Sequence, residues 1–471
     1  MNENQFSEEF DELKDLIQQF ENMKAGRSHS FLDEDSFELI IDYYEDHEQF
    51  SNAILAAEYG IEHYPYSATM LLKKANLLIE SKKYREALDL LDKAALLDAR
   101  DINLYILQTD IFLALNQHEK AVKLLETQIG QFEGEDRTDL LLELADVYDD
   151  WEEFDQVFDC LYRVLEYDPA NEEALHKICF WAEFTGRAEE SIRLHTKIID
   201  GDPYNELAWF NLATAYQGLK LFEKAIDAYQ YAVAINEKFE YAYRNMADAY
   251  MRLRKYPEAI EVLQRHLEVA KPEDVIYEAI GHCFEKQKKY DQARYYFRKA
   301  YHLSPSDDRL YYRSGHTYML EGNWQQAIKH LMTAIRLNAH SVEYNLAIAE
   351  CYLRMEQYKE ALIYLMEAIR LRPSSMRARI SFIRGLFLAG FYDEAQTQVM
   401  VAMKEIGEKT VFRYYHVAIL LALGKSKEAL LELETALREA PQQVKKLIEL
   451  QPSILQHSAV VDLIARYRRR K

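Results

Sequence analysis

A small residue, most often alanine, returns every 34 residues along most of this chain. The series runs through Ala53, Ala87, Ala121, Ala225, Ala259, Ala293, Ala327, Ala361, Ala395 and Ala429. Val157 and Ser191 hold the same position in the gap, where one spacing is 36 residues and the others are 34. A period of this length is typical of a solenoid, in which each unit packs only against its neighbours. Such stacking lets 471 residues form one array without separate globular cores.

Other recurring positions predict a pair of helices in each unit. A small residue such as Ala213 or Gly281 precedes the marker by twelve residues, and an aromatic such as Tyr216 follows three residues later. Small residues let two helices approach closely, and a proline such as Pro305, twelve residues after the marker, ends the second helix. We therefore predict an all-α fold with twelve helix-turn-helix units over 34–443 and a two-residue insertion near 130–137.

This pattern resembles the tetratricopeptide repeat, in the form of a long solenoid of bacterial type. The unit at 206–239 matches it best, with family positions filled by Trp209, Leu212, Ala213, Tyr216, Ala225 and Tyr229. The resemblance implies an α-α superhelix, a right-handed solenoid. It also has local departures: Ser191 and His195 replace alanine and an aromatic, and Ile383 and Val417 replace small residues. These departures leave the local curvature open.

The segments outside the repeats are expected to close the array. Residues 1–33 carry an apolar stripe at helical spacing that includes Leu13, Leu16 and Phe20, which predicts an N-terminal capping helix. Residues 444–471 predict capping helices and a basic tail. We expect the final Arg468-Arg-Arg-Lys to be solvated and to offset the dipole of the last helix.

Charge and composition restrict the possible partners and compartment. A formal net charge of −22 argues against nucleic acid as a partner, because phosphate binding needs a basic surface. No run approaches the ~20 apolar residues of a membrane span, and the N-terminus lacks the basic and apolar regions of a signal peptide. The four cysteines have no metal-binding or redox spacing. We predict an acidic, cytoplasmic protein without a membrane or nucleic-acid partner.

The sequence favours a protein that is not an enzyme. The repeats occupy nearly the whole chain, and we find no phosphate-binding glycine loop, zinc-protease motif or nucleophile elbow. No catalytic residue, cofactor or metal is therefore predicted. A remote alternative is a metal-dependent enzyme, because Glu278, His282 and Glu285 share one helix face and His316 holds the equivalent position in the next unit. We favour the interpretation that these are ordinary polar residues of a groove wall.

The resemblance also implies where a partner would bind. In that family the first helices line the concave face, and ligands contact their second, fifth, ninth and twelfth positions. These positions are acidic in the first repeats, aromatic and basic in the middle, and basic near the end. The candidate partner-binding groove comprises Phe180, Phe210, Tyr241, Arg244, Asp248, His282, Arg309, Tyr312, His316, Arg377 and Arg384. Aromatic residues and arginine dominate binding hot spots. The alternative for any one of these aromatics is packing between adjacent first helices.

We predict a non-enzymatic protein-protein interaction scaffold that binds an extended peptide or a partner helix in this groove. A second hypothesis is self-assembly. Residues 1–67 hold 17 acidic and 3 basic side chains, whereas residues 376–471 hold 10 acidic and 16 basic ones. Head-to-tail contacts between such ends would give rings or filaments that weaken as salt rises.

Overall fold

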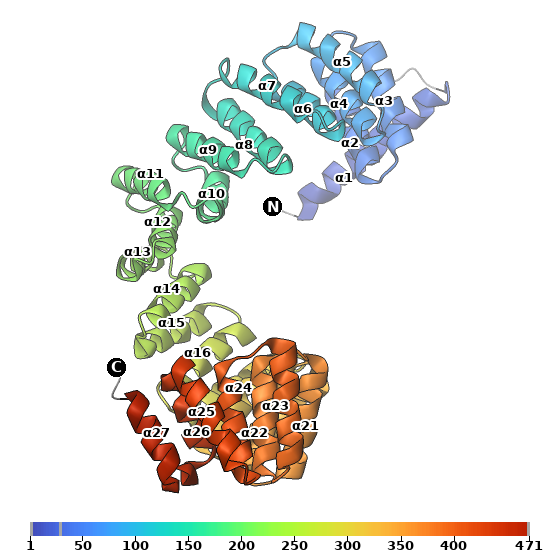
Figure 1. Ribbon diagram of the computed structural model, residues 1–471. Helices are drawn as coiled ribbons and strands as arrows, with labels where there is room; N and C mark the ends of the chain where they lie inside the picture. The colour runs from blue at the N-terminus through green and yellow to red at the C-terminus, as the bar shows by residue number, and fades with distance from the viewer. Residues whose placement is uncertain (1–2, 28–30, 469–471) are drawn as a thin grey trace. The chain divides into compact units, whose positions relative to one another are not determined.

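The computed structural model describes residues 3–27 and 31–468, with side chains from Leu13 to Tyr467. Within this part every regular element is a helix, which confirms the all-α prediction. The chain forms two compact units, Met1–Ala242 and Tyr243–Lys471, and each is described by itself. Figure 1 labels the helices in chain order.

Twelve consecutive helix pairs account for residues 34–439. The first helices are α2 (Glu34–Asp46), α4 (Ala68–Glu80), α6 (Ile102–Ala114), α8 (Gly134–Asp150), α10 (Glu172–Phe184), α12 (Glu206–Gly218), α14 (Glu240–Arg252), α16 (Asp274–Lys286), α18 (Asp308–Glu321), α20 (Val342–Arg354), α22 (Met376–Leu388) and α24 (Thr410–Ala422). The second helices are α3 (Phe50–His63), α5 (Tyr84–Leu97), α7 (His118–Ile129), α9 (Phe154–Tyr167), α11 (Ala188–Gly201), α13 (Phe222–Ile235), α15 (Tyr256–Val269), α17 (Tyr290–Leu303), α19 (Trp324–Leu337), α21 (Tyr358–Leu371), α23 (Tyr392–Ile406) and α25 (Ser426–Glu439). Outside the pairs lie α1 (Glu3–Lys24), η1 (Pro441–Gln443), α26 (Val444–Leu450), η2 (Pro452–Gln456) and α27 (Ser458–Arg468).

The extra residues near 130–137 lengthen one helix. α8 has 17 residues, whereas α6 and α10 have 13 each. The additional turn begins at Gly134, whose positive φ of 67° suits a residue without a side chain. The preceding helix α7 has 12 residues, two fewer than α5 and α9, so the two inserted residues and these two together extend the start of α8. The pairing of α8 with α9 is kept.

Each first helix ends in one residue with left-handed backbone conformation. These residues keep the repeat spacing and are Glu48, Lys82, Asn116, Glu152, Gly186, Lys220, Arg254, Lys288, Gly322, Glu356, Gly390 and Gly424. At Gly322 the φ is 79°, and the following Asn323 N–H donates to the Tyr318 carbonyl at 2.9 Å. This hydrogen bond satisfies a carbonyl at the helix end and turns the chain into the second helix.

We expect Gly322→Ala to lower the free energy of unfolding by about 1–2 kcal/mol, because a side chain at positive φ meets the following carbonyl. Gly218→Ala is the matched control. Gly218 is the last residue of α12, and an added Cβ would meet only the Ala188 Cβ at 4.0 Å. The same substitution should there raise stability by roughly 0.4–1 kcal/mol, because alanine restricts the unfolded chain more than glycine does. Urea denaturation of both variants measures whether the free energy of unfolding changes in opposite directions. Equal changes in the two variants would contradict this account of the turn.

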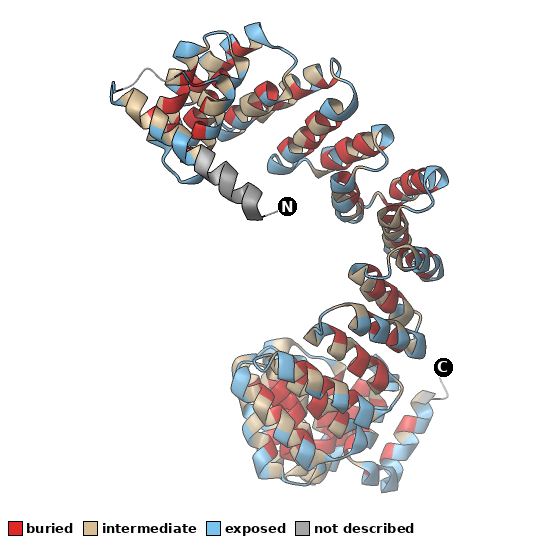
Figure 2. Ribbon diagram, turned by 180° about the vertical axis from the view of Figure 1, so that it is seen from behind, coloured by how far each residue is buried: buried red, intermediate tan, exposed pale blue. Residues whose placement is uncertain are grey.

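The close approach within a pair depends on the predicted small residues. Gly281 on α16 faces the ring of Phe297 on α17, and a Cβ at Gly281 would lie 2.7 Å from that ring. Gly315 faces Leu331 in the next pair, where the equivalent distance is 2.9 Å. Phe297 and Leu331 are fully buried. Figure 2 marks the buried residues along each helix.

The polar departure in the fifth pair is a satisfied hydrogen-bond network. His195 on α11 is fully buried; its Nδ1 lies 2.7 Å from the Ser191 carbonyl, and its Nε2 lies 3.2 Å from the amide nitrogen of Asn211 on α12. That nitrogen also donates to the Leu175 carbonyl at 2.7 Å. Burial lowers the pKa of His195 to about 4, so the ring is neutral at pH 7. Hydrogen bonding thus allows polar side chains where aromatic packing is usual.

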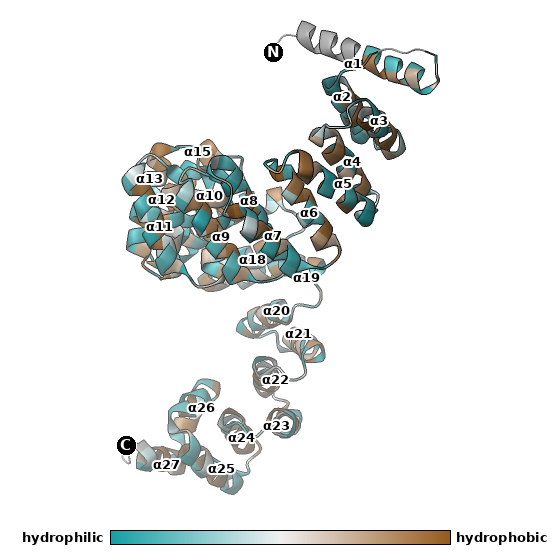
Figure 3. Ribbon diagram, turned by 90° about the horizontal axis from the view of Figure 1, so that it is seen from above, coloured by the Kyte–Doolittle hydropathy of each residue, from teal (hydrophilic) through white to brown (hydrophobic). Residues whose placement is uncertain are grey.

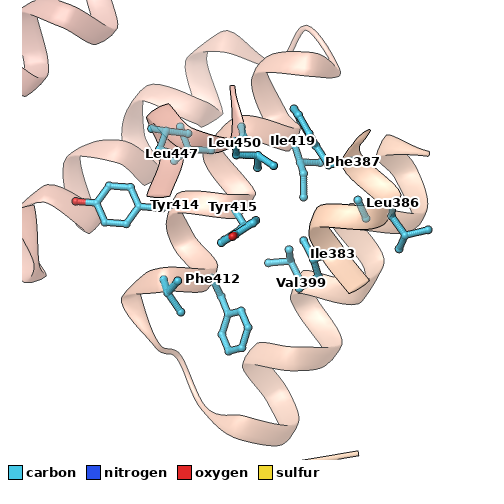
Figure 4. Packing of buried hydrophobic residues seen from close by; sticks show 14 of the residues in the cluster. Ile383, Leu386, Phe387, Val399, Phe412, Tyr414, Tyr415, Ile419, Leu447 and Leu450 are labelled. Carbon is cyan, nitrogen blue, oxygen red and sulfur yellow. The ribbon is translucent and has the colours of Figure 1, made fainter. Parts of the chain in front are cut away.

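The last pairs fill their interior with larger side chains. Ile383 and Val417, which replace small residues, are fully buried in a cluster that continues into α26 through Leu447 and Leu450 (Figure 4). Helix α26 packs on α24, and α27 packs on α25. The C-terminal helices therefore complete the core of the last repeats. The end of the basic tail, residues 469–471, lies outside the described residues.

At the other end, α1 covers the first pair. Phe20 is fully buried, and its ring meets those of Phe37, Tyr44 and Tyr59 edge-on. The Tyr44 hydroxyl also donates to Glu21 at 2.8 Å. The apolar stripe read from the sequence therefore packs on α2 and α3 where its side chains are described.

The first helices form the inner layer of each unit. Contacts join α2 to α4, α4 to α6, α6 to α8 and α10 to α12, and in the other unit α18 to α20, α20 to α22 and α22 to α24. Among second helices a comparable contact joins α9 and α11. Because the inner side of a curved stack is the shorter one, elements there lie closer together. Figure 3 shows polar and apolar residues alternating along these helices.

Candidate partner-binding faces

The inner layer of first helices presents two surfaces that a partner could contact. We call the exposed and half-exposed side chains of α2, α4, α6, α8, α10 and α12 the acidic face, and those of α16, α18, α20, α22 and α24 the mixed face. Each surface lies within one compact unit.

The acidic face carries a row of carboxylates. They include Asp35, Glu38, Asp42, Glu45, Asp110, Asp139, Glu143, Asp146, Asp149, Glu173 and Glu183. Burial raises the pKa of Glu38, Asp110 and Asp139, and neighbouring carboxylates raise it further. Both effects disfavour the charged forms of these carboxyl groups. A cation that bound beside them would stabilise the carboxylates and offset the repulsion between them.

In two places the chain supplies that cation itself. Lys73, the sixth residue of its unit, forms an ion pair with Asp42 of the preceding first helix. Lys177, at the same position of its unit, lies 3.0 Å from Asp146 and 2.8 Å from Glu173. In both cases the side chain at the sixth position of one unit forms an ion pair with the side chain at the ninth position of the preceding unit.

Glu143 holds this sixth position in the repeat of α8, where it faces Asp110 of α6. Burial, with smaller contributions from Asp110 and Asp146, raises the pKa of Glu143 to about 7, and Lys177 opposes this shift. Within residues 3–27 and 31–468, no side chain forms a hydrogen bond or ion pair with Glu143. We call Asp110, Glu143 and Asp146 the acidic junction.

We expect Glu143→Gln to stabilise the protein at pH 8 by about 1–3 kcal/mol, because the amide keeps the volume and removes a repelled charge. A carboxyl whose pKa is higher in the folded state destabilises the fold as pH rises from its unfolded pKa of 4.5 toward 7. The gain should therefore vanish near pH 4.5. Thermal melts of both proteins across this range test it; a pH-independent difference would contradict the repulsion.

Exposed aromatic rings lie next to the acidic junction. Phe180 and Phe184 on α10 are 58% and 59% exposed, and their rings stack with centroids 6.0 Å apart. Trp181 contacts both edge-on and stacks on Phe154 of α9 at 5.3 Å, which fixes the pair from beneath. Lys177, one helical turn before Phe180, bonds to Asp146 of the junction.

The remaining predicted aromatics of this unit differ in exposure. Phe210 is half-buried, with its ring 5.0 Å from Phe239 and 5.7 Å from Tyr229. It therefore packs within its own repeat and the following turn. Tyr241, at the start of α14, is 65% exposed.

On the mixed face two of the predicted arginines, Arg309 and Arg384, form ion pairs within the chain. Arg309 bonds to Asp307, the capping residue of its own helix, at 2.7 Å. Arg384 pairs with Glu350 of the preceding first helix at 3.0 Å. Such half-exposed pairs are worth ~1 kcal/mol or less, so they can be exchanged for contacts with a partner.

Residues from the start of the second unit behave similarly. Arg244 lies 3.4 Å from Glu273, the residue before α16, and Asp248 lies 3.3 Å from Arg252 on its own helix. Both charged residues predicted on α14 are therefore engaged in ion pairs within this unit.

The histidine constellation is divided between two ion pairs. Arg313, at the sixth position of its unit, bonds to Glu278 and donates to His282 Nδ1 at 3.4 Å. Glu285 pairs instead with His316 at 3.5 Å. Burial and the adjacent Arg313 lower the pKa of His282. Arg313 therefore contacts two of the four predicted groups, and the described residues contain no group of three or more His, Cys, Asp or Glu suited to a metal.

Tyr312 and Arg377 lie together farther along this face. The Tyr312 ring stacks on Tyr344 at 4.9 Å, and its hydroxyl donates to Glu343 at 3.0 Å. Burial and Glu343 raise the pKa of Tyr312 to about 12, whereas the nearby Arg377 opposes that shift. Arg377 itself is exposed and has no ion-pair partner among the residues that the structure describes.

Sequence reasoning missed the sixth position of the unit. Glu143 and Arg313 both lie there, and neither belongs to the positions inferred from the family resemblance. Aligning the repeats of this chain with one another would have revealed it, because Lys73 and Lys177 share that position. The exposure of Phe184, beside the predicted Phe180, was also missed.

Stacked helix pairs whose first helices form an inner layer define an α-solenoid repeat protein. Residues 182–329 match the family described as tetratricopeptide repeat protein 21 C-terminal ARM domain, and residues 318–380 match the tetratricopeptide repeat itself. Residues 182–380 thus match models of tetratricopeptide-repeat families, in agreement with the resemblance found in the sequence. These matches indicate no enzyme family.

Several solved structures are similar to parts of the chain. YrrB, described as a TPR protein with an unusual peptide-binding site, is 20% identical, with 39% of this chain and 95% of YrrB covered and a TM-score of 0.34. The C-terminal part of a TPR protein from Cytophaga hutchinsonii is 15% identical, with 54% and 98% covered and a TM-score of 0.44. A tetratricopeptide repeat protein from Parabacteroides merdae is 17% identical, with 52% and 97% covered and a TM-score of 0.37.

Among curated proteins, no sequence matches this chain. In the part of the chain that the structure describes, no helix combines the length and apolarity needed to cross a lipid bilayer.

Proposed function

We propose that this protein is a non-enzymatic scaffold that binds a segment of another protein along the inner faces of its helix pairs. The observation that carries the proposal is the exposure of aromatic side chains on first helices, above all Phe180 and Tyr241. Large exposed rings on a repeat surface bury substantial area when a partner covers them. The occupant is an extended peptide or a partner helix, both of which suit an inner layer of parallel first helices.

Affinity capture from native lysate tests this proposal. We expect two double variants, Phe180→Ala with Tyr241→Ala and Tyr312→Ala with Arg377→Ala, to reduce recovery of a specific partner about tenfold or more. The double variant that recovers less of the partner identifies the compact unit that binds it. The matched control is Ile363→Ala with Leu431→Ala, which removes exposed apolar side chains from second helices. The proposal fails if only the control variant loses the partner, or if no variant does.

Head-to-tail self-assembly remains a weaker candidate. Some basic side chains of the last repeats are bound within the unit: Arg379 pairs with Glu405, and Arg413 contacts Glu408, Glu432 and Glu439. These pairs reduce the positive charge that could attract the acidic first repeat of another copy. We therefore keep partner binding as the proposed function.

A further inference from the structure

We propose that the acidic face binds a partner segment in which a lysine or arginine enters the acidic junction and an apolar side chain covers Phe180 and Phe184. This inference rests on the proposed function and adds the chemistry of the partner and the place where it docks. The rings alone would accept many apolar groups. The charge beside them selects among these groups.

Comparison among the repeats of this chain indicates the cation. At the α2–α4 and α8–α10 contacts, a lysine in the sixth position neutralises an aspartate in the ninth position of the preceding unit. At the α6–α8 contact, the sixth position is Glu143 and the ninth is Asp110. Two carboxylates thus face each other where other repeats place an ion pair. A cation from the partner would complete the pairing that the chain omits here.

The exposed rings point to the second half of the ligand. Phe180 and Phe184 are more than half exposed although Trp181 and Phe154 hold them in place from below. A rigid aromatic surface loses little conformational entropy when an apolar side chain covers it. The exposed parts of the Phe180 and Phe184 rings are thus held in a fixed position and do not contribute to the buried core of their own repeat.

The spacing between the two halves follows from the helix packing. Lys177 connects α10 directly to Asp146 of the junction, and Phe180 lies one turn farther along α10. Adjacent packed helices are ~8–10 Å apart, and an extended peptide advances ~3.3 Å per residue. The basic and the apolar residue of the partner should therefore be about three residues apart. An acidic segment would be repelled from the same face.

Fluorescence anisotropy with the full chain tests this pairing. The probe is a short labelled peptide of glycine and serine that carries one arginine and one tryptophan about three residues apart. We expect it to bind about tenfold or more tightly than the same peptide with glutamate for arginine, or with serine for tryptophan. Equal binding of the three peptides would overturn the proposal.

Glu143→Lys is the decisive variant, because it supplies within the chain the cation that Lys73 and Lys177 supply elsewhere. It should fold at least as stably as the wild type, so a loss of binding cannot be attributed to unfolding. We expect binding of the basic probe to fall about tenfold. The matched control is Asp89→Lys, which makes the same charge change at an exposed residue of α5 and should bind as the wild type does.

Phe180→Ala with Phe184→Ala tests the other half and should weaken the probe to a similar extent, while Tyr204→Ala, an exposed aromatic in a turn, should not. If calcium alone binds the junction and displaces the peptide, the junction is a metal site and the proposal is wrong. Capture of the native partner by the Glu143→Lys variant separates this inference from the proposed function. If the variant still captures that partner in full, the scaffold function holds, but the proposal that the partner binds through a basic residue is wrong.

Discussion

Phe297→Ala is expected to lower the free energy of unfolding by about 3–5 kcal/mol, because it empties an enclosed site between two helices. Phe297 on α17 is fully buried, and its ring lies against the backbone of Gly281 on α16. Its removal leaves a cavity that the close approach of the two helices cannot fill. Urea denaturation followed by circular dichroism measures the loss. Tyr295→Ala, on the exposed side of the same helix, is the control and should cost less than about 0.5 kcal/mol.

The contact with Gly281 makes this prediction sharper. Gly281→Ala alone should cost about 1–3 kcal/mol, because its Cβ would lie 2.7 Å from the Phe297 ring and 3.2 Å from the Ala293 carbonyl. Added to Phe297→Ala, the same methyl enters the vacated space and should cost much less. The coupling energy from this double-mutant cycle should be of order 1–3 kcal/mol. Strict additivity would mean that the glycine does not set the approach of the helices.

Acid should destabilise this protein through His195, by about 3 kcal/mol between pH 6.5 and pH 4. The ring is fully buried and neutral, with a folded pKa of about 4 against an ordinary value of 6.5. The unfolded chain therefore binds a proton that the folded chain rejects. The stability is fully present above pH 6.5 and is lost as the pH falls toward 4. A shift of one pKa unit corresponds to ~1.4 kcal/mol.

His195→Leu isolates this contribution, because carboxyl groups titrate in the same range. The variant should be less stable at pH 7, since Asn211 loses a buried hydrogen-bond partner. Its stability should also fall less between pH 6.5 and 4 than that of the wild type. Denaturant titrations of both proteins at several pH values give the difference. Parallel pH profiles would show that His195 does not carry the acid sensitivity.

The fold was predictable because its determinants are periodic. Proline at Pro305 and the small residues at Gly281 and Gly315 act locally, and each acts in the same way in its own repeat. A period also indicates its own interruption, so the sequence predicts an insertion before α8, but it does not predict that α8 is longer by about one helical turn.

The candidate site was less predictable, because it depends on contacts between repeats. The resemblance to a family supplied positions that face a groove, but it does not say which charges pair with one another. Arg384 and Arg309 are bound to carboxylates of the chain, and Arg313 separates the carboxylates and imidazoles that suggested a zinc site. The unpaired Glu143 became visible only once the pairs around it were known.

The hydrogen bonds of His195 also distinguish one repeat from all others during folding. Arrays of similar repeats can misfold when a helix docks on the wrong neighbour, since most alanine and leucine contacts are interchangeable. If α12 docked beside another second helix, Asn211 would lose both the His195 nitrogen and the Leu175 carbonyl, and its buried amide would be left unsatisfied. These hydrogen bonds therefore favour the one arrangement in which α12 packs beside α10 and α11.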